Sequence, residues 1–453
     1  MAMTYQQALA YLYSLTNYEV KAASAYAPQF FDLRRVQRLL DALGNPERRY
    51  LSVHIAGTKG KGSTSAMLAS ILRQAGYRTG LYTSPHLHSF RERIQVDGEM
   101  IGEQELADLA ARIHPIAAED SELTTFEVAT ALAFEYFARC QIQVAVVEVG
   151  LGGRLDATNV LQPAVSVITT IGHDHMHILG HTLAQIAGEK AGIIKPGTPV
   201  VSAPQQRPAM EVIRRTARRQ AAPLHAVSRL WTWRATCHSL ECQEFTASRH
   251  AGRDLWSLHG LCLPLLGTHQ LRNAGVVLET VAVLRTAGLK IEDEAVRHGM
   301  ASVCWPARFE ILGSRPHFVV DGAHNLDSAH VLARTLRTYF PGQRPWLVLG
   351  ILSDKDIPAI LHQLLPISAG AFLASSRHPR AADPLELQQL AAAYDVPTRV
   401  CDSILHATEQ AVVAAGENGL VVATGSFTTA GAAREAWLRL HGRPLPPLDP
   451  HVG

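Results

Sequence analysis

The feature that most constrains this sequence is a glycine-rich loop, Gly57-Thr58-Lys59-Gly60-Lys61-Gly62-Ser63, set between a strand and a helix. Before the loop, Leu51, Val53 and Ile55 alternate with other residues, a pattern that predicts a strand. After it, apolar residues recur at helical spacing from residue 67 to residue 75, and Gly76 stands where helices commonly end. The sequence therefore predicts a strand, a tight loop and a helix in immediate succession.

A loop in this position is typical of a polyphosphate site. Its backbone N–H groups and the positive end of the helix dipole converge on one point, and Lys61 adds a positive charge. The common phosphate-loop pattern requires a glycine five residues before Gly60, where this chain has Ile55. The alternative is that the glycines serve only the turn.

Composition narrows the class of protein. A chain of 453 residues suggests two or three domains. The balance of 42 basic against 40 acidic residues gives no reason to expect a nucleic acid or membrane surface as partner. No apolar run is long enough to cross a bilayer, and no basic segment followed by an apolar one marks a secretory signal. The six cysteines are scattered, as in reduced proteins, so we expect a cytoplasmic location. Cys237 and Cys242 are close enough in sequence to suggest a metal site, but no second pair of ligands follows at the spacing that zinc sites require.

Strand-like runs alternate with helical patterns, which predicts parallel sheets and an α/β fold. The first series of strands is expected at residues 52–56, 79–82, 144–149, 165–169 and 198–202. Residues 222–266 look like a small antiparallel addition, and a long helix is expected at 269–286. A second series follows at 318–320, 347–349, 371–373, 399–400 and 420–422. We therefore predict an N-terminal domain of the P-loop ATPase type with a mostly parallel sheet, residues 1–304, and a smaller Rossmann-like α/β domain, residues 305–453.

Polar residues follow several predicted strands, where open α/β sheets bind ligands. Ser84 lies in a loop before a proline, and Glu148 ends an apolar strand. A hydroxyl and a carboxylate beside a phosphate loop are oxygen ligands of the kind that Mg²⁺ takes. The alternative for Glu148 is a structural pair with Arg154. Lys190, taken alone, is typical of a surface lysine.

The loop from residue 173 to residue 181 contains four histidines, namely His173, His175, His177 and His181. Their spacing alone is compatible with a transition-metal cluster. We interpret His173, His177 and His181 as solvated loop residues that do not bind a metal.

Seven motifs in this order resemble the folylpolyglutamate synthase and dihydrofolate synthase family, within the Mur-type ADP-forming amide ligases. They cover nearly the whole chain and comprise residues 57–63, 83–87 with 92–94, 148–159, 174–175, 189–193, 267–274 and 321–325. The resemblance implies ATP-dependent addition of L-glutamate, through an acyl phosphate, to a folate, to dihydropteroate or to both. It implies small-molecule partners only, and we expect a monomer.

The resemblance also implies roles for single residues. ATP would contact Gly57, Thr58, Lys59, Gly60, Lys61, Gly62, Ser63, Asn273 and Arg308, together with Asp321 and His324 of the second domain. One Mg²⁺ would be held by Ser84 and Glu148, and a second by His175 and a carbamylated Lys190. The pterin would lie near Phe126 and Asp156, and Lys61, His175 and Lys190 would act in catalysis. A carbamate requires a neutral amine, which burial favours by lowering the lysine pKa.

Some positions depart from the family pattern. Lys59 replaces a common asparagine, Ala307 stands where a glycine is usual before Arg308, and His173 takes a position that is commonly apolar. Residues 350–356 and 380–384 match the family but receive no role. Residues 424–427 are either a second anion-binding turn or a simple connection between a strand and a helix.

Two other functions compete with this interpretation. A different Mur-type ligase, such as one acting on a cell-wall precursor, would share the phosphate loop and the Mg²⁺ ligands, but residues 83–87 and 155–159 resemble the folate branch. A nucleotide-switched binding module predicts a guanine-reading Asn-Lys-x-Asp element, which the sequence lacks.

Overall fold

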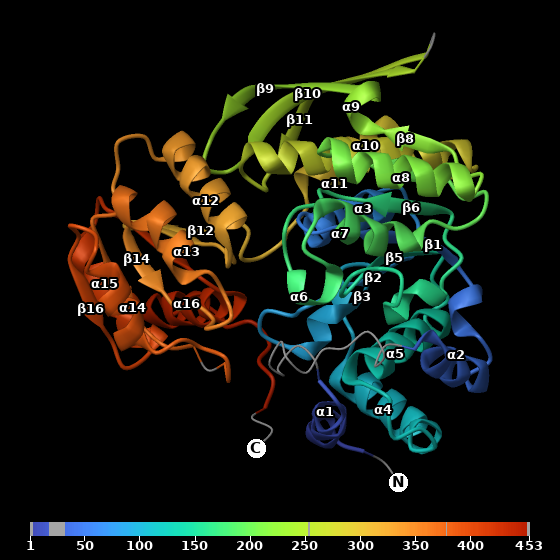
Figure 1. Cartoon of the computed structure of the whole chain (residues 1–453), viewed down its shortest axis with the longest axis horizontal. Helices are drawn as coiled ribbons and strands as arrows, with labels where there is room; N and C mark the ends of the chain where they lie inside the picture. The colour runs from blue at the N-terminus through green and yellow to red at the C-terminus, as the bar shows by residue number, and fades with distance from the viewer. Residues whose placement is uncertain (1–2, 18–31, 252–253, 377, 451–453) are drawn as a thin grey trace.

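A computed structural model describes residues 3–17, 32–251, 254–376 and 378–450. It contains two α/β units, drawn in blue to yellow and in orange to red in Figure 1. The strands are β1 (Leu51–Ala56), β2 (Thr79–Tyr82), β3 (Ile94–Val96), β4 (Glu99–Met100), β5 (Val144–Glu148), β6 (Val165–Ile168), β7 (Val200–Ser202), β8 (Leu224–Ala226), β9 (Trp231–His238), β10 (Gln243–Ala251), β11 (Asp254–Leu263), β12 (Glu310–Ser314), β13 (His317–Val320), β14 (Trp346–Leu349), β15 (Gly370–Leu373), β16 (Thr398–Val400) and β17 (Leu420–Thr424).

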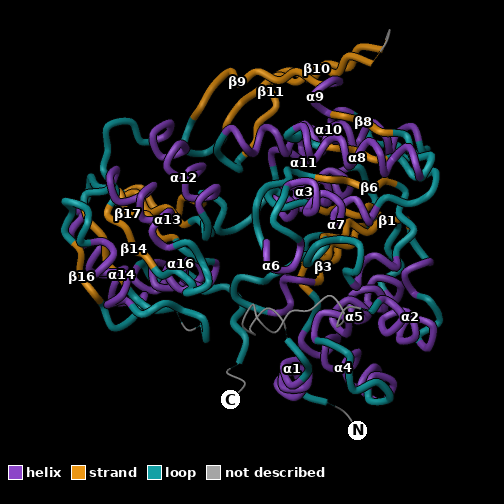
Figure 2. Tube along the Cα trace, in the orientation of Figure 1, coloured by secondary structure: helices purple, strands orange, loops and turns teal. Residues whose placement is uncertain are grey.

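Helices connect most of these strands, and Figure 2 shows them as purple coils around the orange strands. The α-helices are α1 (Tyr5–Ser14), α2 (Leu33–Ala42), α3 (Lys61–Gln74), α4 (Glu103–Ala117), α5 (Thr125–Arg139), α6 (Met176–Leu179), α7 (Leu183–Lys190), α8 (Arg207–Arg219), α9 (Val227–Leu230), α10 (Thr268–Thr286), α11 (Asp293–Ala301), α12 (Leu326–Tyr339), α13 (Ile357–Leu364), α14 (Pro384–Ala391), α15 (Ile404–Ala415) and α16 (Phe427–Leu440). The short 3-10 helices are η3 (Pro46–Arg48), η4 (Phe90–Arg93), η5 (Ala157–Val160), η6 (Ala191–Ile193) and η7 (Leu365–Ile367).

The first unit is built on an eight-stranded sheet in the order β4-β3-β2-β5-β1-β6-β7-β8. Strands β2, β5, β1, β6, β7 and β8 are parallel, whereas β3 and β4 pair antiparallel at one edge. One face packs on α3, α10 and α11, and the other packs largely on α4 and α5. Because β1 is central, Ser52 and His54 are buried along with their apolar neighbours.

The second unit is a six-stranded sheet in the order β12-β13-β17-β14-β15-β16, parallel except for β12 at its edge. A separate three-stranded antiparallel sheet, β11-β10-β9, packs on α10 and extends from the top of the molecule in Figure 1. The predicted fold class is therefore confirmed. The predicted antiparallel addition is also present, within residues 231–263.

The sequence located most strands of both sheets to within a few residues but did not predict the antiparallel edge strands β3, β4 and β12. It also assigned residues 224–226 to the antiparallel addition, whereas β8 pairs parallel with β7 in the first sheet. Strands β3 and β4 are short, with three and two residues, so they carry almost no periodic signal. Among the described residues, no helix is both long and apolar enough to cross a membrane.

Candidate active site

A cavity of about 1590 Å³ is lined by residues of both α/β units. Every site residue singled out from the sequence lines it. These are Gly57, Thr58, Lys59, Gly60, Lys61, Gly62, Ser63, Ser84, Phe126, Glu148, Asp156, His175, Lys190, Asn273, Arg308, Asp321 and His324. Residues spread over more than 260 positions of sequence are therefore brought to one cavity.

The glycine-rich loop follows the central strand β1 and leads directly into α3. Gly60 occupies the N-cap position of α3 with a left-handed φ of 88°, and no side chain caps this helix end. A side chain at position 60 would also run into the amide of Asn273 on α10. Both the backbone conformation and the space therefore require glycine here. The first residues of α3 line the cavity, so the uncapped start of this helix lies at the cavity, as an anion site requires.

Glu148 ends the central strand β5, and its side chain is 5% exposed. One carboxylate oxygen lies 3.8 Å from Lys61 Nζ, and the other accepts a hydrogen bond from the backbone N–H of Ser84 at 3.3 Å. Burial raises the pKa of this carboxyl, although Lys61 opposes the shift. Arg154 instead pairs with Glu189 at 3.2 Å, so the alternative Glu148–Arg154 pair does not form.

Lys190 lies at the end of α7 and is buried, with 4% of its surface exposed. Among the described residues, its ammonium group has no hydrogen-bond or ion-pair partner. Burial, together with the charge of Lys61, lowers the pKa of Lys190 to about 7. A substantial fraction of this side chain is therefore a neutral amine near neutral pH, and the interpretation as a surface lysine is wrong.

Phe126 and Asp156 both contact the loop that follows β5. The Phe126 ring, in the first turn of α5, packs on Gly150 so tightly that a side chain there would collide with it. Asp156 accepts hydrogen bonds from the backbone N–H groups of Leu151 and Thr158, at 2.8 Å and 3.0 Å. Asp156 therefore also fixes the shape of this loop.

The sequence did not predict that buried His54 on β1 supports Asp156. His54 Nε2 lies 2.7 Å from Thr158 Oγ1, and this hydroxyl donates to the Asp156 carboxylate. The sequence signal that could have indicated this role is a histidine at a central position of a mostly apolar strand.

Two loops of the second unit contribute Arg308 and Asp321. The Asp321 carboxylate, after β13, accepts from the backbone N–H groups of Phe309 and Ala323, at 2.8 Å and 2.9 Å. The Arg308 guanidinium lies 4.3 Å from the centre of the Phe427 ring. Ala307 has a left-handed φ of 55°, a backbone conformation that glycine adopts more readily than alanine.

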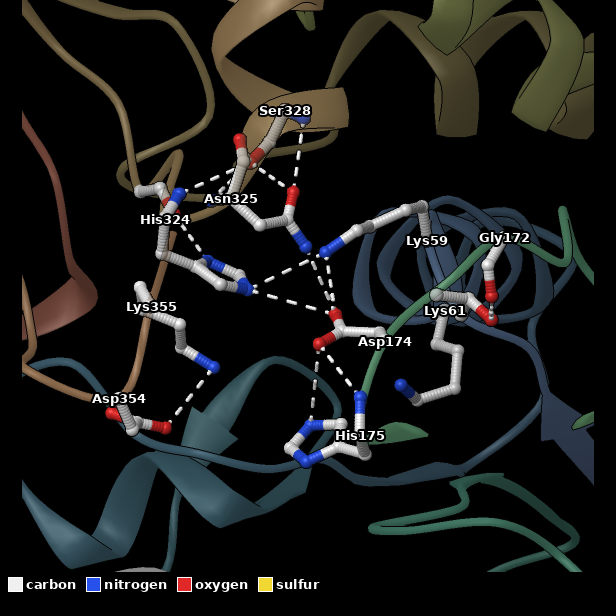
Figure 3. Close-up of polar contacts among 12 residues, drawn as sticks. Lys59, Lys61, Gly172, Asp174, His175, His324, Asn325, Ser328, Asp354 and Lys355 are labelled. Carbon is white, nitrogen blue, oxygen red and sulfur yellow. Dashed lines mark hydrogen bonds and ion pairs between the residues drawn. The ribbon is translucent and has the colours of Figure 1, made fainter. Parts of the chain in front are cut away.

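Figure 3 shows polar side chains from both units meeting at Asp174. Asp174 Oδ2 accepts from Lys59 Nζ at 2.8 Å and from Asn325 Nδ2 at 3.1 Å. Lys59 Nζ also lies 3.4 Å from His324 Nε2. Asp174 and Asn325 belong to motifs that the sequence singled out, but no role was assigned to them. Their contact across the two units, which only the structure reveals, sets Asp174 and Asn325 apart from the other residues of these motifs.

The additional histidines of this region, His173, His177 and His181, are exposed. In the part of the chain that the structure describes, no group of three or more histidine, cysteine, aspartate and glutamate side chains could hold a metal ion. A transition-metal cluster of histidines is therefore not formed by the described residues.

Comparison with known proteins identifies the family. The model of the Mur ligase middle domain matches residues 55–281, and that of the Mur ligase glutamate ligase domain matches residues 307–427. A Bacillus subtilis dihydrofolate synthase/folylpolyglutamate synthase is 38% identical over 84% of this chain and 87% of its own length.

Solved structures give the same result. Mycobacterium tuberculosis folylpolyglutamate synthase in complex with ADP superposes with a TM-score of 0.85 at 34% identity, covering 98% of this chain and 99% of that one. Escherichia coli FolC in complex with DHPP and ADP gives 0.84 at 32% identity, covering 97% and 99%. The chain belongs to the folylpolyglutamate synthase/dihydrofolate synthase family of ADP-forming Mur ligases.

Proposed function

We propose that this enzyme joins L-glutamate to the carboxylate of a pterin substrate and releases ADP and phosphate. The acceptor is a reduced folate, dihydropteroate or both. The observation that carries the proposal is the single cavity that contains the glycine-rich loop, the loop of Asp156 and polar residues of the second unit. Such a space accommodates a nucleotide and an acyl acceptor side by side.

The proposed nucleotide site comprises Gly57, Thr58, Lys59, Gly60, Lys61, Gly62, Ser63, Asn273, Arg308, Asp321 and His324. The uncapped start of α3 and the nearby Lys61 support it, because both favour phosphate groups. We propose Phe126 and Asp156 as contacts of the pterin. The aromatic ring of Phe126 offers a stacking surface, and the Asp156 carboxylate accepts hydrogen bonds from N–H groups.

We propose that Ser84 and Glu148 hold one Mg²⁺ and that His175 and carbamylated Lys190 hold a second. The donors fit a hard cation, because Glu148 is a buried carboxylate whose ion-pair partner among the described residues, Lys61, lies 3.8 Å away. When bound, Mg²⁺ would neutralise charge on the phosphate oxygens.

The environment of Lys190 supports the carbamate. This buried amine has no hydrogen-bond or ion-pair partner in the part of the chain that the structure describes, and its pKa is lowered to about 7. Such an amine is able to form an N–C bond to CO₂ and lose a proton. The product is an anion with two oxygen donors.

In the proposed reaction, the substrate carboxylate attacks the γ-phosphorus of ATP and ADP leaves. The amine of glutamate then attacks the carbonyl carbon of the acyl phosphate, loses a proton and expels phosphate. Lys61 stabilises the charge that develops on the transferred group, and the loops of both units orient the reactants. Enclosure between the units would protect the acyl phosphate from water.

The decisive experiment measures ADP release by the purified protein with ATP, glutamate and one acceptor at a time. We expect turnover with a reduced folate, with dihydropteroate or with both, and none when glutamate is omitted. Turnover with a cell-wall precursor and not with either pterin would favour the competing Mur-type ligase. ATP hydrolysis that is independent of every acceptor would favour the nucleotide switch.

We further propose a domain boundary between residues 304 and 305, a monomeric state and a cytoplasmic location. The second sheet begins at Glu310, soon after this boundary, which supports the division. All six cysteines are free thiols, which agrees with a reducing compartment.

A further inference from the structure

Four polar residues form a closed ring between the two α/β units at the cavity. We name Lys59, Asp174, His324 and Asn325 the interdomain ring (Figure 3). Lys59 and Asp174 belong to loops of the first unit, whereas His324 and Asn325 follow β13 of the second. Lys59 contacts His324, Asp174 contacts Asn325, and the Lys59–Asp174 ion pair joins these two contacts. His324 Nε2 also lies 3.9 Å from Asp174 Oδ2, so both members of the first unit contact the second unit and Asp174 faces both of its members.

The hydrogen bonds of the ring fix the tautomer of His324. Its Nδ1 lies 2.9 Å from the carbonyl oxygen of Gly322, which can only accept, so Nδ1 carries the proton. The opposite nitrogen, Nε2, therefore has a free lone pair, and the Lys59 ammonium lies 3.4 Å from it. Each hydrogen bond of the ring therefore pairs a donor with an acceptor: Lys59 and Asn325 donate, and Asp174 accepts from both.

Asn325 has two separate tasks. Its side-chain oxygen accepts from the backbone N–H of Ser328 at 3.1 Å and so caps the start of α12. Its side-chain nitrogen reaches across to Asp174 Oδ2 at 3.1 Å. The first task requires only a side-chain acceptor, and the second requires the amide N–H. The start of α12 is thereby tied to the loop that follows β6 in the first unit.

We propose that Asn325 is a positioning residue. Through its bond to Asp174, it holds Asp321 and His324, the nucleotide contacts of the second unit, at a fixed position relative to the glycine-rich loop. The importance of these contacts rests on the proposed function, because Asp321 and His324 bind nucleotide only if the cavity is an ATP site. The position of these residues depends on the angle between the units, and interfaces between domains are easily displaced. A bond between the first turn of α12 and the loop after β6 restrains that angle beside the ligand.

The two tasks of Asn325 can be separated by substitution. Asn325→Ser keeps an oxygen that caps α12, since serine is as good an N-cap as asparagine, but it removes the N–H that reaches Asp174. Ser328→Ala is the matched control. It removes the hydroxyl that accepts from the backbone N–H groups of His324 and Asn325, at 3.0 Å and 3.1 Å, and that donates to Asn325 Oδ1 at 2.8 Å. The Asn325 side-chain N–H that reaches Asp174 is retained.

The first measurement is the affinity for a non-hydrolysable ATP analogue by calorimetry, without any acceptor. We expect Asn325→Ser to weaken binding about ten-fold, the effect of one lost charge-assisted hydrogen bond, while Ser328→Ala stays within about two-fold of the unsubstituted enzyme. Small-angle scattering of the nucleotide-bound Asn325→Ser enzyme should give a larger radius of gyration. Unchanged affinity in Asn325→Ser, or equal weakening in Ser328→Ala, would refute the proposal.

Two further measurements isolate the contact. In turnover assays, Asn325→Ser should raise the KM for ATP more than it lowers kcat, and the thermal midpoint should not change. In a double-mutant cycle, Asp174→Ala combined with Asn325→Ser should weaken nucleotide binding no more than Asp174→Ala alone. Additive losses would show that Asn325 acts elsewhere. If the enzyme binds nucleotide but ligates no pterin, the proposed function fails while the ring is still tested by affinity and scattering.

Discussion

Two buried glutamates, Glu148 in the cavity and Glu279 on α10, differ in their hydrogen-bond partners and in the direction of their pKa shifts. Glu279 is fully buried and surrounded by donors. His225 lies at 2.8 Å, Trp231 Nε1 donates at 2.7 Å, and the Arg249 guanidinium donates at 2.7 Å and 2.9 Å. Burial tends to raise its pKa, but the hydrogen bonds from these three side chains lower it below the ordinary value.

Glu148 is nearly as buried but has one backbone hydrogen bond and an ammonium group 3.8 Å away. Its pKa is raised by burial. A carboxylate whose lone pairs all accept hydrogen bonds from the protein stabilises the fold. In the case of Glu279, these bonds attach the three-stranded sheet to α10. A buried carboxylate with unfilled lone pairs at a cavity is instead prepared for an external ligand. The predictions below test this distinction.

The largest change is expected in the scaffold. Glu279→Ala leaves the Arg249 guanidinium without its carboxylate, so the free energy of unfolding should fall by about 3–5 kcal/mol. Urea unfolding checks this, with Glu211→Ala as control, because Glu211 belongs to an exposed pair with Arg207 and should change stability by less than about 1 kcal/mol. A loss below about 1 kcal/mol in Glu279→Ala would remove the contrast between the two glutamates.

Lys61→Ala should have the largest effect on activity at the cavity. Loss of a charge directed at the phosphates should lower kcat/KM roughly a hundred-fold or more, while the thermal midpoint stays unchanged. Steady-state ADP release and thermal melting check both parts. Lys290→Ala, at an exposed position outside the cavity, serves as the control. Near-normal turnover in a folded Lys61→Ala enzyme would place the ATP site elsewhere.

Glu148→Gln preserves shape and removes the negative charge. The Mg²⁺ concentration for half-maximal activity should rise at least about ten-fold, and stability should be equal or higher, because burial disfavours the charged carboxylate. Mg²⁺ titration and melting curves of the same variant decide the outcome. A lower melting temperature with unchanged Mg²⁺ dependence would make Glu148 a structural carboxylate like Glu279.

The pKa of Lys190 predicts a pH-dependent stability. In CO₂-free buffer the native lysine loses its proton above pH 7, whereas the unfolded lysine keeps it up to about 10.5. The unfolded state therefore binds more protons in this window, and stability rises with pH. Relative to Lys190→Met, the unsubstituted enzyme should gain about 1 kcal/mol between pH ~7.5 and ~8.5. Parallel stability curves for the two proteins would show that Lys190 is protonated in the native state.

The smallest effect is expected for Arg154→Ala. Its pair with Glu189 is partly exposed, so the free energy of unfolding should change by less than about 1 kcal/mol. The Mg²⁺ titration should be unchanged, since Arg154 does not pair with Glu148. A shift in Mg²⁺ dependence would instead connect Arg154 to the metal site.

Much of the site was predictable because it follows strand ends. Parallel strands deliver their carboxyl ends to one edge, so the loops after β1, β5 and β6 were expected to meet. The sequence could not predict the partners of individual groups. Asp174 and Asn325 lie 151 positions apart, and no local pattern links them. Nor could it show that Arg154 pairs with Glu189 and leaves Glu148 to Lys61.

The sequence by itself determined the α/β class and the glycine-rich loop, because periodicity and turn chemistry are local properties. Most of the other site residues were expected from the resemblance of whole motifs to a known family. Only the tertiary structure decided the electrostatic state of those residues. Lys190 is an ordinary lysine in the sequence and a buried amine of lowered pKa in the fold. A pKa depends on burial and on charges brought close by distant segments, and these arise only when the two sheets and their helices are assembled.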